Sequence, residues 1–281
     1  MDNVKYVYIL GSGHSGSTLL ELLISNQPKI FALGEIVNIA KVFERNSICS
    51  CGKPVLSCSV WSRVLSGFSP EEILDLDFGF DLKKIQSNLF CSNFLAVYLR
   101  LLENLQSIVQ CRIFTDSSKF LEPLFLLQQI AGLDLRIIYN TRHAGGVVNS
   151  YLKKGSRFFK TSLGWAAQNK KAQIYLKNSG LPWIHVEYEK MVKNPELEIE
   201  KIFEFLDYDF DSKLVHDFKN VRHLVEGNRI RMKHQELSIK SPVPWENAFS
   251  PFGRLFLEIV NSIGSIENRK ITDSCRNLRD S

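Results

Sequence analysis

A glycine-rich turn follows a short apolar stretch near the start of the 281-residue sequence. Residues 6–10 read YVYIL and residues 11–20 read GSGHSGSTLL, which predicts a buried strand, a tight turn and then a helix. Glycines let backbone N–H groups approach an anion closely, and the positive end of the helix dipole points at the same place. The segment therefore predicts a loop that holds a phosphate group of a nucleotide. The alternative is an ordinary strand, turn and helix junction, because short glycine patterns match many unrelated proteins.

Ser17 occupies the position at which the phosphate-binding loop of nucleoside triphosphatases carries a lysine. The spacing from Gly11 to Gly16 fits the pattern G-x-x-x-x-G-K-[ST]. The lysine of that pattern neutralises the β and γ phosphates, and the hydroxyl that follows it binds magnesium. A loop without the lysine suits a ligand that has fewer phosphates and needs no metal. A 5′-phosphosulfate fits this description.

A second pair of candidate anion ligands lies in the middle of the chain. Residues 135–141 form an apolar stretch that predicts another buried strand, and Arg142 follows it directly. Ligands of open α/β sheets bind beyond the carboxyl ends of the strands, and an arginine fork suits a bidentate contact with phosphate. Ser150 lies eight residues further on, in the second turn of an expected helix. The alternatives are an arginine paired with a surface carboxylate and a serine on a solvated helix face.

These segments together resemble the sulfotransferases that use 3′-phosphoadenylyl sulfate (PAPS). Four segments match the family in order and spacing, and a weaker fifth match looks like the family's C-terminal segment that covers the cofactor. The segments are residues 11–20 with Pro28, Gly34 and Glu35, residues 115–119, residues 142–150, residues 186–195 and, more weakly, residues 227–231. The motif layout is most similar to that of the tyrosylprotein and carbohydrate sulfotransferases.

The resemblance implies a sulfotransferase that takes PAPS as its sulfuryl donor and uses no metal. In the family the first loop holds the 5′-phosphosulfate, and a later arginine and serine, here Arg142 and Ser150, hold the 3′-phosphate. Arg231 would belong to the segment that covers the cofactor. The residues of the first loop that would bind the cofactor are Gly13, His14, Ser15, Gly16, Ser17 and Thr18.

His14 is the clearest departure from the family pattern, because many members carry an arginine at that position. A guanidinium is always charged, whereas an imidazole titrates near neutrality. His14 is therefore expected to donate to the phosphosulfate either only while it is protonated or through a single N–H. We count it among both the cofactor-binding and the catalytic candidates.

Glu35 and Lys119 are the other catalytic candidates. By analogy with phosphoryl transfer, sulfuryl transfer needs a base for the acceptor proton and donors for the leaving phosphate. The resemblance puts Glu35 at the position of the catalytic glutamate of tyrosylprotein sulfotransferases, although a carboxylate there also suits the first turn of a helix. It implies in addition that Lys119 touches the bridging oxygen of the donor. The alternative for Lys119 is an ordinary surface lysine.

The order of the expected elements predicts an α/β fold, a three-layer P-loop-like arrangement with a central parallel sheet flanked by helices. Strands are expected at residues 5–10, 112–115, 135–141 and 183–187, and helices at about 17–26, 93–108, 120–131, 144–154, 163–178 and 195–206. Asp116 and the two serines after it are expected to cap the helix near residue 120. The length suits a single domain over residues 1–281, with a long irregular insert at about 45–80.

Three of the six cysteines lie close together in this insert, namely Cys49, Cys51 and Cys58. A structural zinc site needs four tetrahedral ligands, and no fourth cysteine or histidine lies nearby in the sequence. Reduced cysteines that pack a cap on the substrate side, a disulfide and a metal site are all open, although a disulfide would be unusual in a cytoplasmic protein. The other three, Cys91, Cys111 and Cys275, are expected to be core or incidental residues.

Composition and charge indicate the kind of partner. The formal net charge of +5, from 35 basic and 30 acidic residues, suits an anionic ligand. The basic residues are scattered without an aromatic stacking platform, so nucleic acid is not an expected partner. The sequence shows neither a run of about 18 apolar residues nor an N-terminal signal, and we expect a cytoplasmic protein without a membrane span. The expected acceptor is a small molecule, a carbohydrate or a peptide, and the sequence does not indicate the oligomeric state.

Two other functions are compatible with the sequence. The first is a metal-dependent nucleoside or small-molecule kinase with a degenerate phosphate loop, which could offer Asp116 to magnesium. The missing loop lysine argues against it. The second is a nucleotide-binding protein that kept the fold and lost turnover, for which His14 in place of arginine is the main support.

Overall fold

The computed structural model describes residues 4–76, 88–218, 221–233, 239 and 244–265, without the side chains of residues 88–92. The chain separates into two compact units. The first comprises Met1–Arg142 with Leu181–Val243, and the second comprises His143–Gly180 with Pro244–Ser281. The single domain expected over residues 1–281 stays a prediction.

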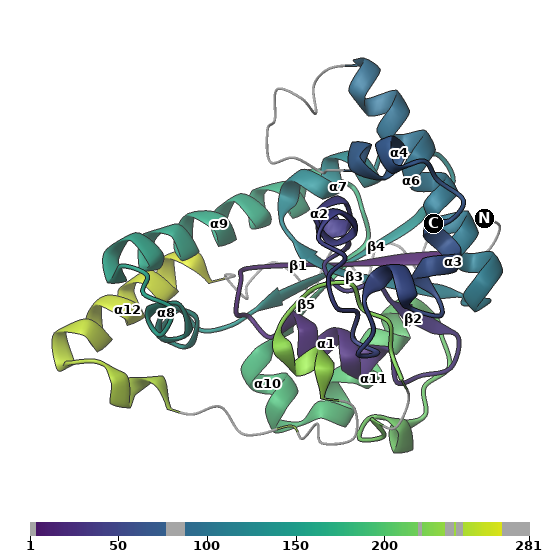
Figure 1. Cartoon of the computed structure of the whole chain (residues 1–281). Helices are drawn as coiled ribbons and strands as arrows, with labels where there is room; N and C mark the ends of the chain where they lie inside the picture. Colours follow the sequence, from purple (N-terminus) through teal and green to yellow (C-terminus); the bar gives the residue numbers. More distant parts are fainter. Residues whose placement is uncertain (1–3, 77–87, 219–220, 234–238, 240–243, 266–281) are drawn as a thin grey trace. The chain divides into compact units, whose positions relative to one another are not determined.

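The first unit is built around a parallel sheet whose strands, within the described residues, number five and run in the order β2-β3-β1-β4-β5 (Figure 1). The strands are β1 (Lys5–Gly11), β2 (Ile30–Ala32), β3 (Ile113–Lys119), β4 (Asp134–Thr141) and β5 (Trp183–Glu187). From β1 the chain runs to β2 and β3 on one side, and later to β4 and β5 on the other. The strand order therefore reverses at β1, the kind of point at which open α/β sheets bind ligands.

Helices cover both faces of this sheet (Figure 1). On one face lie α1 (Ser17–Ile24), α10 (Tyr188–Lys193) and α11 (Pro195–Leu206), whose apolar residues share one core with Val7, Ile9 and Ile138 of the sheet. On the other face lie α6 (Asn88–Val109) and α7 (Leu121–Leu127). There Tyr6 packs edge-on against Tyr98 of α6. The predicted α/β fold with a central parallel sheet flanked by helices is confirmed.

The segment expected to be irregular contains several short helices. After η1 (Ile36–Asn38) and α2 (Ile39–Glu44) come η2 (Val55–Ser57), α3 (Trp61–Leu65) and α4 (Pro70–Asp75). The last begins with a capping box, in which the Ser69 hydroxyl accepts from the Glu72 N–H and the Glu72 carboxylate accepts from the Ser69 N–H. Residues 77–80 of the expected insert lie outside the described residues.

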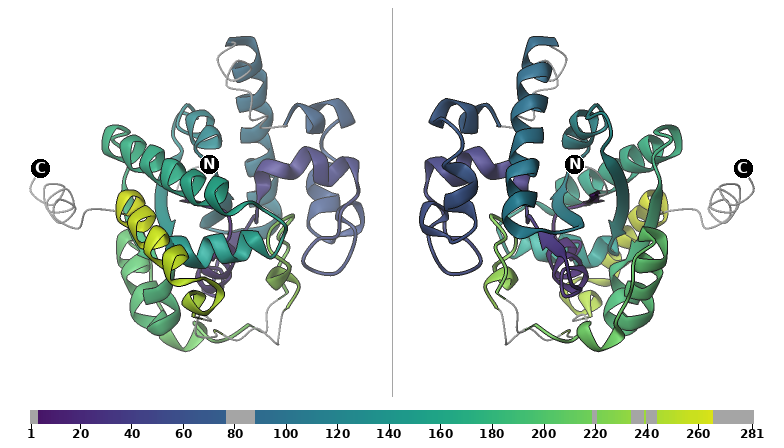
Figure 2. Two further views of the ribbon diagram at one scale, coloured as in Figure 1. Left: turned by 90° about the vertical axis from the view of Figure 1, so that its left-hand side faces the viewer. Right: turned by 90° about the vertical axis from the view of Figure 1, so that its right-hand side faces the viewer.

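The second unit is helical. It contains α8 (Ala144–Leu152), α9 (Phe158–Asn178), η5 (Trp245–Ala248) and α12 (Pro251–Gly264), and α12 lies beside α9 (Figure 2). Gly264 allows this packing, because a Cβ there would lie 2.4 Å from Cζ3 of the buried Trp165. Among the helices of the described residues, we find none with the length and apolar character that a membrane span requires.

The main differences from the predicted elements are in β2, β3 and α10. The three-residue β2 and the six-residue α10 were not expected, because such short elements show little periodicity. Strand β3 continues through Lys119, four residues beyond the expected end, and the N-cap of α7 is Phe120. Cys111 is buried as expected, whereas the side chain of Cys91 and all of Cys275 lie outside the described residues.

Candidate anion-binding and catalytic site

The glycine-rich loop connects the carboxyl end of β1 to the N-terminus of α1. Gly16 is the N-cap of α1 and has a φ of 89°, a left-handed conformation that favours glycine. A Cβ on Gly16 would lie 2.3 Å from Cδ2 of Tyr188, so the Tyr188 ring packs directly on the turn. From β4, the Asn140 side chain donates to the backbone oxygen and the hydroxyl of Ser15, each at 3.1 Å. The loop is thus fixed by contacts with both β4 and α10.

Arg142 lies against this loop, immediately after β4. Its Nη1 donates to the backbone oxygen of His14 at 3.1 Å, and its guanidinium carbon lies 4.3 Å from the centroid of the Tyr188 ring. Arg142 follows the carboxyl end of β4, as the sequence predicted, and in addition contacts the loop backbone. Its assignment to a 3′-phosphate stays a prediction. The φ of His14 is 64°, and the predicted role of its side chain stays a prediction.

Four buried polar atoms near the loop have no hydrogen-bond partner within the described part of the chain. They are Ser12 Oγ, Asn140 Oδ1, Arg142 Nε and Arg231 Nε. Buried polar groups are nearly always hydrogen-bonded, so an unpartnered set indicates a place for a ligand. Two of the four are guanidinium donors and fit an anion such as a phosphate or a phosphosulfate, whereas Asn140 Oδ1 is an acceptor.

Lys119 and Glu35 form an ion pair beside the loop. Lys119 is the last residue of β3, where its Cα is the register partner of Leu10 in β1, and it is only 7% exposed. Its Nζ donates to Oε1 of Glu35. Glu35 stands at the N-cap position of η1 but makes no side-chain capping bond. Glu35 therefore stands at the start of a helix, the alternative that the sequence left open, while its carboxylate pairs with the lysine. Its role as a base stays a prediction.

Glu21 links the backbones that carry this pair, and the sequence interpretation missed it. It is fully buried in α1, where its Oε1 accepts from the Gly34 N–H at 2.9 Å and the Ser117 hydroxyl donates to its Oε2 at 2.6 Å. Burial raises the pKa of Glu21 to about 8, although the hydrogen bonds from Ser117 and Gly34 oppose the shift. Glu21 therefore ties α1 to Gly34, which precedes Glu35, and to Ser117, which lies two residues before Lys119. A glutamate within the apolar run of α1 was the available signal.

Asp116 does not cap α7, and that prediction is wrong. It is fully buried within β3, where the Tyr6 hydroxyl donates to Oδ2 at 2.7 Å and the Ser118 N–H donates to Oδ1 at 2.8 Å. Burial raises the pKa of Asp116 to about 6, although these hydrogen bonds oppose the shift. The hydrogen bonds with Tyr6 and Ser118 hold the Asp116 carboxyl inside the sheet layer. A fully buried carboxyl in that position is not open to a ligand.

The segment at residues 224–231 contacts Thr18 and Glu35. Asn228 N–H donates to Thr18 Oγ1 at 3.3 Å, and the N–H of Glu35 donates to the backbone oxygen of Glu226 at 3.3 Å. A Cβ on Gly227 would lie 3.4 Å from Thr18 Oγ1 and 3.7 Å from Glu35 Oε1. Within residues 227–231, which the sequence predicted to cover a cofactor, Asn228 contacts Thr18, and the neighbouring Glu226 contacts Glu35. The covering role stays a prediction.

Ser150 lies in α8, in the second unit. Its hydroxyl donates to the backbone oxygen of Gly146 at 2.9 Å, a bond within the helix that a serine makes readily. Its assignment to a 3′-phosphate stays a prediction.

Solved structures of sulfotransferases are similar to this chain in fold. The sulfotransferase domain from the Synechococcus PCC 7002 olefin synthase matches with a TM-score of 0.58 and 18% identity, over 95% of this chain and 97% of that one. The sulfotransferase domain from the curacin biosynthetic pathway matches with the same TM-score and identity, over 92% and 96%. This chain has a sulfotransferase-like fold. A mouse sulfotransferase complexed with PAP (adenosine 3′,5′-bisphosphate) matches at a TM-score of 0.50 and 13% identity, over 91% and 82%. No protein-family model and no curated protein matches the sequence.

Proposed function

We propose that this protein transfers a sulfuryl group from PAPS to a hydroxyl or amine of a small-molecule, carbohydrate or peptide acceptor. Within the sulfotransferase-like fold, one observation supports the proposal most. The glycine-rich loop carries Ser17 in place of the phosphate-loop lysine, while Lys119 reaches the same edge of the sheet from β3 and pairs with Glu35. A lysine beside a carboxylate suits a reaction that needs both a donor for a leaving oxygen and a base.

The loop and Arg142 would hold the donor. Bound PAPS would supply the sulfuryl group and a phosphate leaving group. The N–H groups and hydroxyls from Gly13 to Thr18 would bind the 5′-phosphosulfate, together with His14. Arg142 and Ser150 would bind the 3′-phosphate, and Arg231 would cover the nucleotide. The unpartnered Nε atoms of Arg142 and Arg231 support this assignment, because each is a donor that needs an acceptor.

Glu35 and Lys119 would carry the chemistry. Glu35 would accept the proton of the attacking hydroxyl or amine, and Lys119 would donate to the oxygen that leaves sulfur. The ion pair brings both side chains to the same end of the sheet. In an in-line transfer Glu35 would face the attacking atom and Lys119 the leaving oxygen, on opposite sides of sulfur. A glutamate base also makes the layout similar to that of the tyrosylprotein and carbohydrate sulfotransferases, and we include this subtype in the proposal.

The kinase alternative is weakened by Asp116, the carboxylate that could have been offered to magnesium. Its hydrogen bonds to Tyr6 and Ser118 and its complete burial leave it unsuited to a metal ion bound to a nucleotide. A comparison of thermal shifts tests the choice. We expect PAP to raise the Tm of the protein more than ATP with magnesium at equal concentration. The reverse order would favour the kinase.

Turnover itself is tested with radiolabelled PAPS and a panel of sugar, phenol, peptide and amine acceptors. Transfer of label to an acceptor, lost in Glu35→Gln, would support the enzyme. PAP binding without transfer to any acceptor class would favour the second alternative, a nucleotide-binding protein without turnover.

A further inference from the structure

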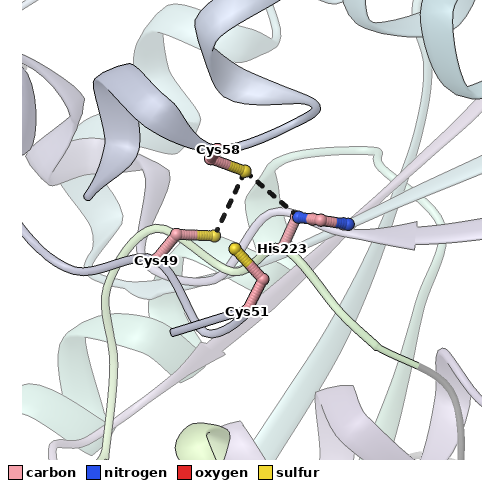
Figure 3. Close-up of side chains that lie close together, drawn as sticks. All are labelled: Cys49, Cys51, Cys58 and His223. Atoms are coloured by element: carbon pink, nitrogen blue, oxygen red, sulfur yellow. Dashed lines mark hydrogen bonds between the residues drawn. The ribbon is translucent and has the colours of Figure 1, made fainter. Parts of the chain in front are cut away.

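Three cysteines and one histidine lie together in the first unit, and none of them belongs to the site described above (Figure 3). Cys49 and Cys51 lie in a tight turn, Cys58 lies just before α3, and His223 comes from the segment that leads to the cofactor-covering residues. The sequence shows no fourth ligand near the cysteines, because His223 lies 165 residues after Cys58. The fold therefore completes a set of ligands that the sequence leaves incomplete.

The geometry of this Cys49-Cys51-Cys58-His223 cluster is that of four ligands around one point. The three Sγ atoms and a ring nitrogen of His223 all lie within 4.8 Å of one another. The Sγ atoms of Cys49 and Cys58 are 3.7 Å apart, and Cys58 Sγ lies 3.1 Å from Nδ1 of His223. Tetrahedral zinc with Zn–S bonds of about 2.3 Å separates its sulfur ligands by about 3.8 Å. The close-up shows the sulfur atoms pointing toward one another, with Nδ1 facing Cys58 (Figure 3).

Neighbouring contacts hold His223 in this position. The Ser50 hydroxyl donates to the backbone oxygen of Arg222 at 2.7 Å and accepts from the Leu224 N–H at 2.9 Å, so Ser50 binds the residues on both sides of His223. The indole N–H of Trp61 donates to the backbone oxygen of His223 at 2.5 Å. Both Ser50 and Trp61 are fully buried. The histidine is thus presented to the sulfur atoms by a backbone that these contacts fix.

We propose that Cys49, Cys51, Cys58 and His223 bind one structural zinc ion. Three thiolates and an imidazole are ligands that zinc prefers, and four protein ligands leave no open position for a substrate or a reactive water. A disulfide is the weaker interpretation, because it would use two of the cysteines and leave the third thiol and the histidine without a role. Packing alone is also weaker, since four such polarisable ligand atoms converge where apolar side chains would fill the space.

The ion would join two segments that are far apart in the sequence. One is the cysteine turn, and the other continues from His223 into residues 224–226, where the Val225 N–H donates to the backbone oxygen of Leu33 at 3.1 Å. Zinc would therefore stabilise residues 223–226, the start of the segment that contacts Glu35 and the loop. The proposal does not rest on the proposed function, since zinc content and nucleotide binding are measured separately.

Metal content tests the proposal directly. We expect the full-length protein, produced with zinc in the medium, to contain about one zinc ion per chain by inductively coupled plasma mass spectrometry. Cobalt(II) added to the chelator-treated protein is expected to give the intense visible bands of tetrahedral coordination and the charge-transfer bands of thiolate ligands. Cys51→Ser changes the most exposed cysteine of the cluster, so it is the variant best placed to fold, and its zinc affinity should fall at least about tenfold. His223→Ala should lose zinc as well, whereas Cys111→Ser, a buried thiol outside the cluster, should retain it.

Three results would overturn the proposal. The first is a folded wild-type protein that lacks zinc and gives no cobalt–thiolate bands. The second is a Cys49–Cys58 disulfide found by mass spectrometry in the folded protein. The third is a zinc affinity of Cys51→Ser and His223→Ala equal to that of Cys111→Ser. A chelator that removes zinc and lowers the Tm of wild type, but leaves the Tm of His223→Ala unchanged, would support a structural role.

Discussion

Lys119 and Glu35 share one ion pair, yet the proposed mechanism gives them opposite tasks. Lys119 would act on the leaving phosphate, which is also present in the product PAP, whereas Glu35 would act only on the acceptor. The two roles can therefore be distinguished by measuring the affinity for PAP and the turnover rate of each variant. A purely structural ion pair would make the two substitutions behave alike.

Glu35→Gln should slow turnover by roughly 10²- to 10⁴-fold, because that is the usual contribution of a general base. The affinity for PAP should stay nearly unchanged, since the amide keeps the shape of the carboxylate and PAP carries no acceptor. Steady-state kinetics with an acceptor identified by the label-transfer screen, together with calorimetry of PAP, checks both values. Glu44→Gln, an exposed glutamate in α2, is the matched control. Wild-type turnover in Glu35→Gln would place the base elsewhere, and His14 would be tested next.

Lys119→Ala should slow turnover by roughly 10²- to 10³-fold, which is typical when a donor to a developing negative charge is removed. Unlike Glu35→Gln, it should also weaken PAP binding, because the lysine would neutralise the 5′-phosphate that PAP retains. The same kinetic and calorimetric measurements apply. If PAP affinity is unchanged in Lys119→Ala, the lysine does not contact that phosphate.

Glu21 predicts a specific pH dependence of stability. Its pKa is raised to about 8 in the folded protein by burial, so the folded state keeps a proton that the unfolded state loses above its ordinary pKa. The free energy of unfolding should therefore decrease as pH rises toward about 8, by about 1.4 kcal/mol per pH unit from this group. Glu21→Gln, which retains both an acceptor and a donor, should remove that component. Urea unfolding between about pH 6.5 and about pH 8 measures it, a range above the pKa of about 6 of Asp116. An unchanged slope in Glu21→Gln would show that Glu21 is ionised in the folded state.

At the scale of elements, the junction of β1, its loop and α1 depends on Gly16. Gly16→Ala should destabilise the fold and weaken PAP binding by at least about tenfold, because the added Cβ meets the Tyr188 ring as well as an unfavourable φ. Gly132→Ala is the matched control, since Gly132 has a φ of 76° but nothing within 4 Å of its Cβ position. It should cost only about 1–2 kcal/mol of backbone strain and leave PAP affinity unchanged. Equal losses of stability and of PAP affinity in the two variants would mean that the Tyr188 contact does not shape the loop.

The sequence predicted the regular elements well where local periodicity is strong. Strand β5 and helix α11 have the predicted bounds, and β1 and β4 differ by one residue at one end. The end of β3 was misplaced because Asp116, Ser117 and Ser118 have the composition of a helix cap. Tyr6 satisfies Asp116, Glu21 satisfies Ser117, and the Ser118 hydroxyl donates to Asp116 and accepts from the Val37 N–H. Most of these partners are distant in sequence, so a buried strand tolerates the three residues.

The candidate site was predictable where a motif carried it and not where tertiary contacts did. Glycine spacing pointed to the loop, and the end of an apolar run pointed to Arg142. Glu21 acts through buried hydrogen bonds that no local pattern shows. His223, the fourth residue of the Cys49-Cys51-Cys58-His223 cluster, is separated from Cys58 in the sequence by strands β3, β4 and β5. Only the fold brings the two together.

At the scale of the whole molecule, the first unit contains the sheet, the loop, Arg142 and the Lys119–Glu35 pair, whereas Ser150 belongs to the second. Most of the residues that we propose to bind PAPS therefore belong to the first unit. The excess of positive charge suits a ligand with several phosphate charges. For Arg142 the proposal names one specific partner, the 3′-phosphate of PAPS.

The most direct measurement is the affinity of the protein for PAP compared with that for 5′-AMP, by isothermal titration calorimetry. We expect wild type to prefer PAP by roughly ten- to a hundredfold, because a charge-assisted hydrogen bond to the additional 3′-phosphate contributes about 1.5–3 kcal/mol. Arg142→Ala should lose most of this preference, while Arg63→Ala, an exposed arginine in α3, should retain it. Equal affinity of wild type for the two nucleotides would contradict the assignment of Arg142 to a 3′-phosphate and, with it, the proposed use of PAPS.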